Sequence, residues 1–159
     1  MDFLHQFVQQ LINGVSLGSI YALIALGYTM IYGIIKLINF AHGDIYMVGA
    51  YIGFFAITRA GLSIVPALLI SMVVTGILGM IVERLAYKPL RHAPRISVLI
   101  TAIGVSFFLE YASMYFVSPT PRTFPEVIPS VAFNVGPFIV NGQQMLIMGI
   151  TLVLMLVLT

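Results

Sequence analysis

The chain of 159 residues is 60% hydrophobic and only 8% charged, with a net charge of +2 and no cysteine. A soluble domain usually carries about 25% charged residues, so this composition excludes a water-soluble fold. The missing thiols exclude disulfides, thiolate metal sites and cysteine nucleophiles. The seven basic residues lie mostly beside apolar segments, which indicates a role in membrane topology and not in nucleic-acid binding.

The apolar residues fall into runs of about 20 residues, the length that a helix needs to cross a hydrocarbon core about 30 Å thick. The first span is predicted at residues 11–35. The apolar stretch 45–58 is short for a span, so the second helix is predicted at 37–58, with residues 39–44 forming its inner end or a break that faces protein or water. The third and fourth spans are predicted at 64–82 and 96–117.

The segment 118–142 contains five prolines, which exclude a continuous helix. Its alternating apolar residues on either side of Gly136-Pro137 predict a small surface hairpin, formed by Val131, Phe133 and Val135 and by Phe138 and Val140. A fifth apolar run, 143–159, reaches the end of the sequence without a polar tail, so we expect this span to be cut. The predicted fold is an all-α polytopic transmembrane helix bundle, a single domain over 1–159 with four full spans and a fifth interrupted one.

The orientation follows from the basic segment 83–95. It holds four basic residues against Glu83, a net charge of +3, and short loops rich in Lys and Arg stay in the cytoplasm because these residues resist translocation. The N-terminus, Arg59 and the loop 118–142 are then predicted outside, and Lys36 inside. The segment could also dock a cytoplasmic partner, although topology alone explains its charge. Its basic residues are Arg84, Lys88, Arg91 and Arg95.

Small residues recur along the predicted spans at spacings of three and four. Such residues let helix backbones approach closely in lipid, where no hydrophobic force drives helices together. We interpret these positions as ordinary helix-packing sites, some of which also form a bundle around a pathway. They are Gly14, Gly18, Gly49, Gly53, Gly76 and Gly79.

Polar residues at membrane depth are candidate functional groups, because an ionisable side chain there costs about 2.5–3.5 kcal/mol on insertion scales. Glu110 lies near the outer third of the fourth span, where it faces a water-filled pathway, pairs with a neighbouring helix or lies at the interface. Asn39, His42, Gly43 and Asp44 form the second group, either a gate or a helix cap at which Gly43 permits a bend. The spacing of His42 and Asp44 does not favour a metal or acid–base pair.

The sequence contains none of the common motifs for nucleotide phosphates or hydrolytic catalysis. We therefore expect a transport subunit with no enzymatic activity and no cofactor of its own. If ATP drives the protein, another chain must bind it.

Specific strings add a family resemblance to this physical description. The chain resembles the LivH-type permease subunit of bacterial branched-chain amino acid ABC importers, and the matching strings are residues 11–14 (Leu-Ile-Asn-Gly), 18–27, 38–43 (Ile-Asn-Phe-Ala-His-Gly), 49–51, 83–91 (Glu-Arg-Leu-Ala-Tyr-Lys-Pro-Leu-Arg) and 99–104. The resemblance implies a multi-pass inner-membrane protein that works by alternating access. It also implies three kinds of partner: a second permease, cytoplasmic ATP-binding subunits and a periplasmic solute-binding protein.

Full-length members of that family continue well past this point, and the loop that engages the ATPase lies in their later half. We therefore expect this sequence to correspond to an N-terminal portion. Two alternatives remain open at this stage. One is a related ABC permease for another small solute, such as a sugar or urea. The other is a non-ABC membrane scaffold or half of a secondary carrier.

Overall fold

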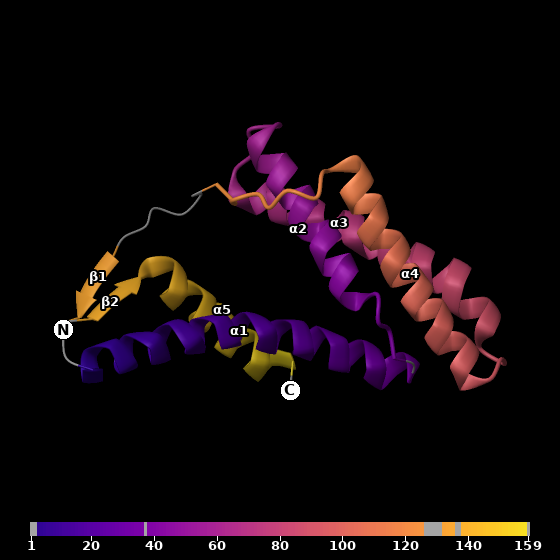
Figure 1. Cartoon of the computed structure of the whole chain (residues 1–159), viewed down its shortest axis with the longest axis horizontal. Helices are drawn as coiled ribbons and strands as arrows, with labels where there is room; N and C mark the ends of the chain where they lie inside the picture. The colour runs from indigo at the N-terminus through magenta and orange to yellow at the C-terminus, as the bar shows by residue number, and fades with distance from the viewer. Residues whose placement is uncertain (1–2, 37, 126–131, 136–137, 159) are drawn as a thin grey trace. The chain divides into compact units, whose positions relative to one another are not determined.

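The computed structural model describes residues 3–36, 38–125, 132–135 and 138–158 (Figure 1). The chain divides into two compact units, which are described separately. The first unit combines Met1–Gly33 with Ile128–Thr159, and the second is Ile34–Val127.

The first unit contains two helices and a hairpin. Helix α1 (Phe3–Ile35) is followed much later in the sequence by strand β1 (Ala132–Val135), strand β2 (Phe138–Asn141) and helix α5 (Gly142–Leu158). The strands pair antiparallel, with Val135 opposite Phe138. This pairing confirms the predicted hairpin, although Val131, Gly136 and Pro137 lie outside the described residues.

Polar contacts join α1 to α5. The Gln144 amide nitrogen donates to Oδ1 of Asn13 at 3.1 Å, and the Thr151 hydroxyl lies 3.5 Å from the carbonyl oxygen of Ser19 while donating to its own helix at Ile147. Asn13 contacts Gln144, and the later residue Ser19 contacts the later residue Thr151. Helices α1 and α5 therefore run parallel. Ser16 and Thr151 are buried, which places polar groups along this contact.

The second unit contains the remaining helices. It consists of α2 (His42–Thr58), α3 (Ile64–Val82), the π-helical turn η1 (Glu83–Tyr87), the 3₁₀ turn η2 (Lys88–Leu90) and α4 (Arg95–Phe116). Its core lies where α3, η1 and α4 meet, and is built from Val82, Tyr87, Val98 and Ala102. Helix α2 packs against α3 at Gly49, which is buried.

The all-helical fold class is confirmed, with the hairpin as a small addition, but some predicted boundaries are wrong. The second helix begins at His42 and not at residue 37. Helix α1 begins at Phe3, ahead of the predicted span 11–35. Residues 83–90, predicted as a loop, are helical because α3 continues into π and 3₁₀ turns.

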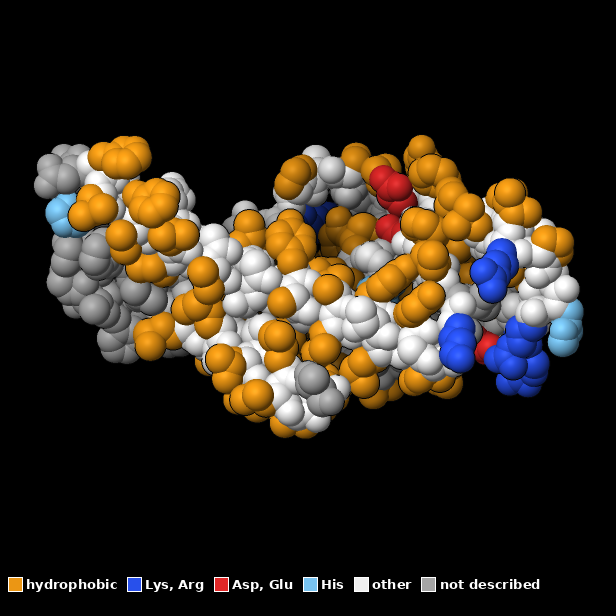
Figure 2. Space-filling model, turned by 90° about the horizontal axis from the view of Figure 1, so that it is seen from below, with side chains coloured by type: hydrophobic (Ala, Val, Ile, Leu, Met, Phe, Trp, Pro, Cys, Tyr) orange, Lys and Arg blue, Asp and Glu red, His pale blue; other side chains and the backbone are white. Residues whose placement is uncertain are grey.

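In the described part of the chain, three helical segments are long and apolar enough to cross a membrane: Phe3–Ile34, Ile64–Leu90 and Arg95–Phe116. Helices α2 and α5 have 17 residues each, so the count of four full spans stays a prediction. Large apolar side chains cover much of the face seen in Figure 2. Exposed apolar surface on this scale is expected where lipid is the solvent.

Candidate functional site

The start of α2 is fixed by the side chain of Asn39. Its Oδ1 accepts a hydrogen bond from the Ala41 backbone nitrogen at 3.0 Å and another from the Tyr87 hydroxyl at 2.7 Å. The His42 backbone nitrogen donates to the Asn39 carbonyl oxygen at 3.2 Å. This Asx-type turn competes with the helix, which is the physical reason that α2 begins only at His42.

Asn39 also connects α2 to the basic segment. Tyr87 belongs to η1 and is only 6% exposed, within the core of the second unit. A hydrogen bond between residues 48 positions apart therefore anchors the entrance of α2 to the segment that follows α3. Sequence reasoning selected Asn39 as a gate residue but gave no indication of this partner.

Asp44 lies in the first turn of α2 and accepts a hydrogen bond from the hydroxyl of Ser106 in α4. Ser106 is about 16 Å along α4 from Arg95 by helical rise, which is about halfway through a hydrocarbon core about 30 Å thick. Helix α2 therefore begins beside α4, about three helical turns from the start of that helix. A carboxylate is favoured at a helix N-terminus, and the hydroxyl donor offsets part of its desolvation.

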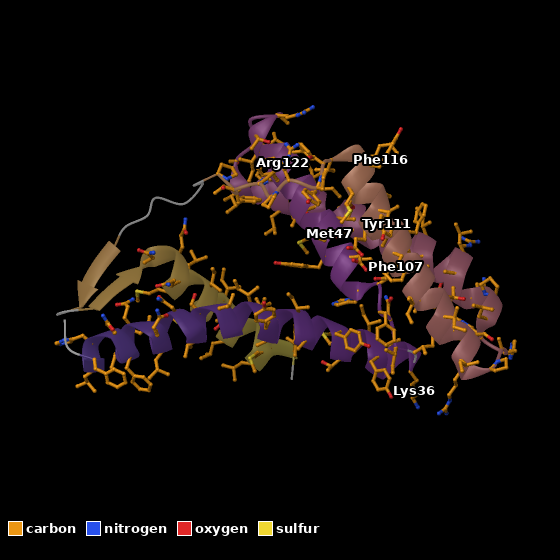
Figure 3. All side chains as sticks on the ribbon, in the orientation of Figure 1. Lys36, Met47, Phe107, Tyr111, Phe116 and Arg122 are labelled. Carbon is orange, nitrogen blue, oxygen red and sulfur yellow. The ribbon has the colours of Figure 1, made fainter. Side chains whose placement is uncertain are left out.

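Glu110 follows Ser106 by one helical turn, so the two side chains share a face of α4. Glu110 is half-buried, and the described residues offer it no ion pair or hydrogen bond. The structure thus brings Asp44 to the α4 face that carries Glu110. Two aromatic side chains of α4, Phe107 and Tyr111, lie close by in the sequence, with their ring centroids 6.4 Å apart (Figure 3).

His42 and Gly43 occupy the first turn of α2. Gly43 is exposed and would have open space for a Cβ atom. The bend predicted at Gly43 lies instead at residues 39–41, because the turn is made by the Asn39 side chain.

An aromatic cluster at the other end of α2 was not predicted. The guanidinium groups of Arg59 and Arg122 lie 5.3 and 5.7 Å from the centre of the Phe55 ring, and the rings of Phe54 and Phe124 are 6.0 Å apart. Arg122 also donates to the Val117 carbonyl oxygen at 2.9 Å. These contacts hold the segment after α4 against the end of α2 through cation–π attraction. No local sequence signal pairs residues so far apart.

The predicted packing glycines differ in their surroundings. At Gly49 an added Cβ would lie 2.8 Å from Cγ2 of Thr75, and the Ser71 hydroxyl donates to the Gly49 carbonyl oxygen at 2.6 Å. Gly49 is therefore a site of close helix contact. The other five have open space for a Cβ atom within this chain, so their packing role stays a prediction: Gly14, Gly18, Gly53, Gly76 and Gly79.

The basic residues of segment 83–95 are all exposed. Nη2 of Arg91 lies 2.7 Å from Oε1 of Glu83, which pairs the segment's acidic residue. Lys36 lies just before Asn39, which contacts Tyr87, so Lys36 and the basic segment are on the same side of the second unit (Figure 3). This agrees with the prediction that both face the same compartment.

The parallel packing of α1 and α5 bears on the number of spans. Two parallel spans of one chain must be separated by an odd number of membrane crossings. If α1 and α5 both span, α3 and α4 supply two of these crossings and α2 would have to supply the third. Helices α2 and α5 have only 17 residues each, so the five-span arrangement stays a prediction.

These features define a multi-pass helical membrane protein with polar contacts between its helices. Residues 10–159 match the family described as branched-chain amino acid transport system / permease component, and the chain belongs to that family.

Similar proteins include the high-affinity branched-chain amino acid transport system permease protein BraD of Pseudomonas aeruginosa, 44% identical over 172 aligned residues that cover 100% of this chain and 56% of BraD. The permease protein LivH of Escherichia coli is 43% identical, and that of Salmonella typhimurium is 42% identical. Each alignment covers 87% of this chain and 46% of the LivH protein. The chain thus spans about half the length of the curated relatives that it matches. No solved structure matches the chain.

Proposed function

We propose that the chain is the N-terminal portion of a permease subunit that moves leucine, isoleucine and valine across the inner membrane as part of an ATP-driven importer. The observation that carries the proposal is the 44% identity to BraD across the whole of this chain. The family description names the same transport system.

The proposed assembly contains a second permease, cytoplasmic ATP-binding subunits that supply the ATP sites, and a periplasmic solute-binding protein. The basic segment 83–95 faces the cytoplasm in this arrangement, and 118–142 faces the periplasm. The charge of the segment and its position between two long apolar helices support this orientation.

Transport in this proposal is conformational. The inner end of α2 is held by two hydrogen bonds, Asn39 to Tyr87 and Asp44 to Ser106, and these are the contacts that we expect to break and re-form as the pathway alternates between its two openings. Both contacts join segments that are distant in sequence, as a gate requires. Glu110, half-buried on α4, is placed on the pathway, because an unpaired carboxylate is tolerated in a membrane where water reaches it.

Uptake measurements test the proposal. Cells that lack the gene are supplied with this chain in its extended form, and accumulation of radiolabelled leucine, isoleucine, valine and an unrelated sugar is measured. We expect uptake of the three amino acids only. Equal amino-acid uptake in deleted and complemented cells would refute the substrate assignment. Sugar uptake that depends on the gene would favour a related importer.

Two variants sharpen the same assay. An inactive ATP-binding subunit should abolish uptake, whereas a secondary carrier would keep it. Glu110→Gln should reduce uptake at an unchanged level of protein in the membrane. Full uptake by this variant would remove Glu110 from the pathway.

A further inference from the structure

The second unit carries a basic surface in which only Arg91 forms an ion pair with another described residue. We define this surface as the basic edge, formed by Arg84, Lys88, Arg91 and Arg95, all of them exposed. Figure 2 shows Lys and Arg side chains gathered around an acidic one. We propose that the basic edge binds the phosphate headgroups of anionic phospholipids.

The first argument is the surplus of charge. Arg91 is paired with Glu83 at 2.7 Å, so its charge is compensated within the chain. Arg84, Lys88 and Arg95 make no ion pair with any described residue. Three exposed cations without acidic partners leave a surplus of positive charge on this surface, which attracts anions. A phosphate group supplies the opposite charge.

The second argument is the apolar surface beside the charges. Leu85, which follows Arg84, is 73% exposed, and Ile96, which follows Arg95, is 66% exposed. A cation next to an exposed aliphatic side chain suits the boundary between headgroups and acyl chains, where the charge reaches the phosphate and the apolar group enters the hydrocarbon. The edge also lies where α3 ends and α4 begins, at the ends of two segments long enough to span.

The third argument is that the segment is anchored. Tyr87 lies between Arg84 and Lys88 in the sequence. Its side chain is buried in the core of the second unit and forms a hydrogen bond with Asn39. The core residues Val98 and Ala102 fix the first turns of α4. The cations are therefore presented by a packed turn, so that ordering the backbone on binding costs little.

These observations favour lipid over a protein partner. Topology requires basic residues in a cytoplasmic segment, but it does not require them to stay unpaired beside exposed aliphatic side chains. A protein partner would need apolar groups to cover Leu85 and Ile96 in addition to acidic groups for the cations. Anionic lipid satisfies both. The proposal rests on membrane insertion alone and not on the transported substrate.

The test uses the full 159-residue chain purified in detergent, where the direction of membrane insertion plays no part. Binding of phosphatidylglycerol and phosphatidylcholine is measured by native mass spectrometry. We expect the wild type to prefer phosphatidylglycerol. Each cation removed should weaken that binding about fivefold, so the triple variant Arg84→Gln/Lys88→Gln/Arg95→Gln should lose about a hundredfold. Circular dichroism verifies that the helices remain.

The matched control is Arg84→Lys/Arg95→Lys, which keeps the charge and should keep the preference. Equal binding of the two lipids by the wild type, or an unchanged preference in the triple variant, would overturn the proposal. So would an equal loss in the lysine control, because charge would then not be what is recognised. The wild type could also show no lipid preference while the triple variant no longer co-purifies with ATP-binding subunits. That pair of results would identify a protein-docking surface and reject lipid binding. Amino-acid uptake is not measured, so this result is independent of the proposed transport.

Discussion

A single methyl group added at Gly49 should separate two helices of the second unit. The new Cβ would lie 2.8 Å from Cγ2 of Thr75 and 3.3 Å from the hydroxyl oxygen of Ser71, whereas carbon atoms in contact lie about 3.5–4.0 Å apart. Thr75 cannot turn aside, because its hydroxyl donates to the Ser71 carbonyl oxygen at 2.6 Å and its branched side chain is stiff. Helix α3 must therefore move, which breaks the Ser71 bond to the Gly49 carbonyl.

The magnitude follows from three opposing effects. Alanine in place of glycine favours a helix by about 1 kcal/mol. Overpacking costs about 1–3 kcal/mol, and a lost hydrogen bond between membrane helices costs about 0.6 kcal/mol. The net destabilisation of Gly49→Ala should be about 1–2 kcal/mol. Gly53→Ala is the matched control, because Gly53 has open space around it and only the helix-favouring effect remains.

The assay is reversible unfolding of the purified protein in mixed detergent micelles, followed by circular dichroism. Gly49→Ala should unfold at a lower denaturant fraction than the wild type, and Gly53→Ala at the same or a higher one. Thr75→Ser removes the methyl group that clashes, so it should restore most of the lost stability in the double variant. Equal stability of the two alanine variants, or no rescue by Thr75→Ser, would refute the close contact.

Two further predictions concern the polar contacts. The chain has no cysteine, so introduced pairs can be cross-linked selectively. A short bismaleimide should cross-link the double variant Asn13→Cys/Gln144→Cys but not Asn13→Cys/Thr151→Cys. The reverse pattern would contradict parallel packing of α1 and α5. Ser106→Ala should lower the unfolding free energy by about 1.5–3 kcal/mol, because the Asp44 carboxylate loses its donor. Ser106→Thr keeps the hydroxyl and should unfold near the wild type, so equal stability of both variants would show that the bond contributes nothing.

The sequence predicted the helices better than their beginnings. The span 64–82 coincides with α3 and the span 96–117 nearly with α4, because long apolar runs report directly on helices in lipid. The start of the second helix was missed because an asparagine side chain can stop a helix locally. In this chain the same asparagine oxygen also accepts a hydrogen bond from Tyr87, a residue far along the sequence.

The residues of the candidate site were also predicted only in part from the sequence. Asp44 and Glu110 were selected from sequence because ionisable residues are rare in membrane spans. Sequence could not assign Ser106 to Asp44, or separate Gly49 from the five glycines with open surroundings. The cluster of Arg59 and Arg122 around Phe55 was equally beyond reach, since its members come from two segments.

By itself, the sequence determined that this protein is a helical membrane protein, and it carried the strings that relate it to a permease family. A low content of charged residues and long apolar runs are properties of the sequence alone, so they can be interpreted without knowing which residues are in contact. Tertiary structure alone decided that α2 begins beside Ser106 of α4, that α1 and α5 run parallel, and that three cations of the basic edge make no ion pair with a described residue. Each of these depends on which residue faces which across helices, and packing makes that choice.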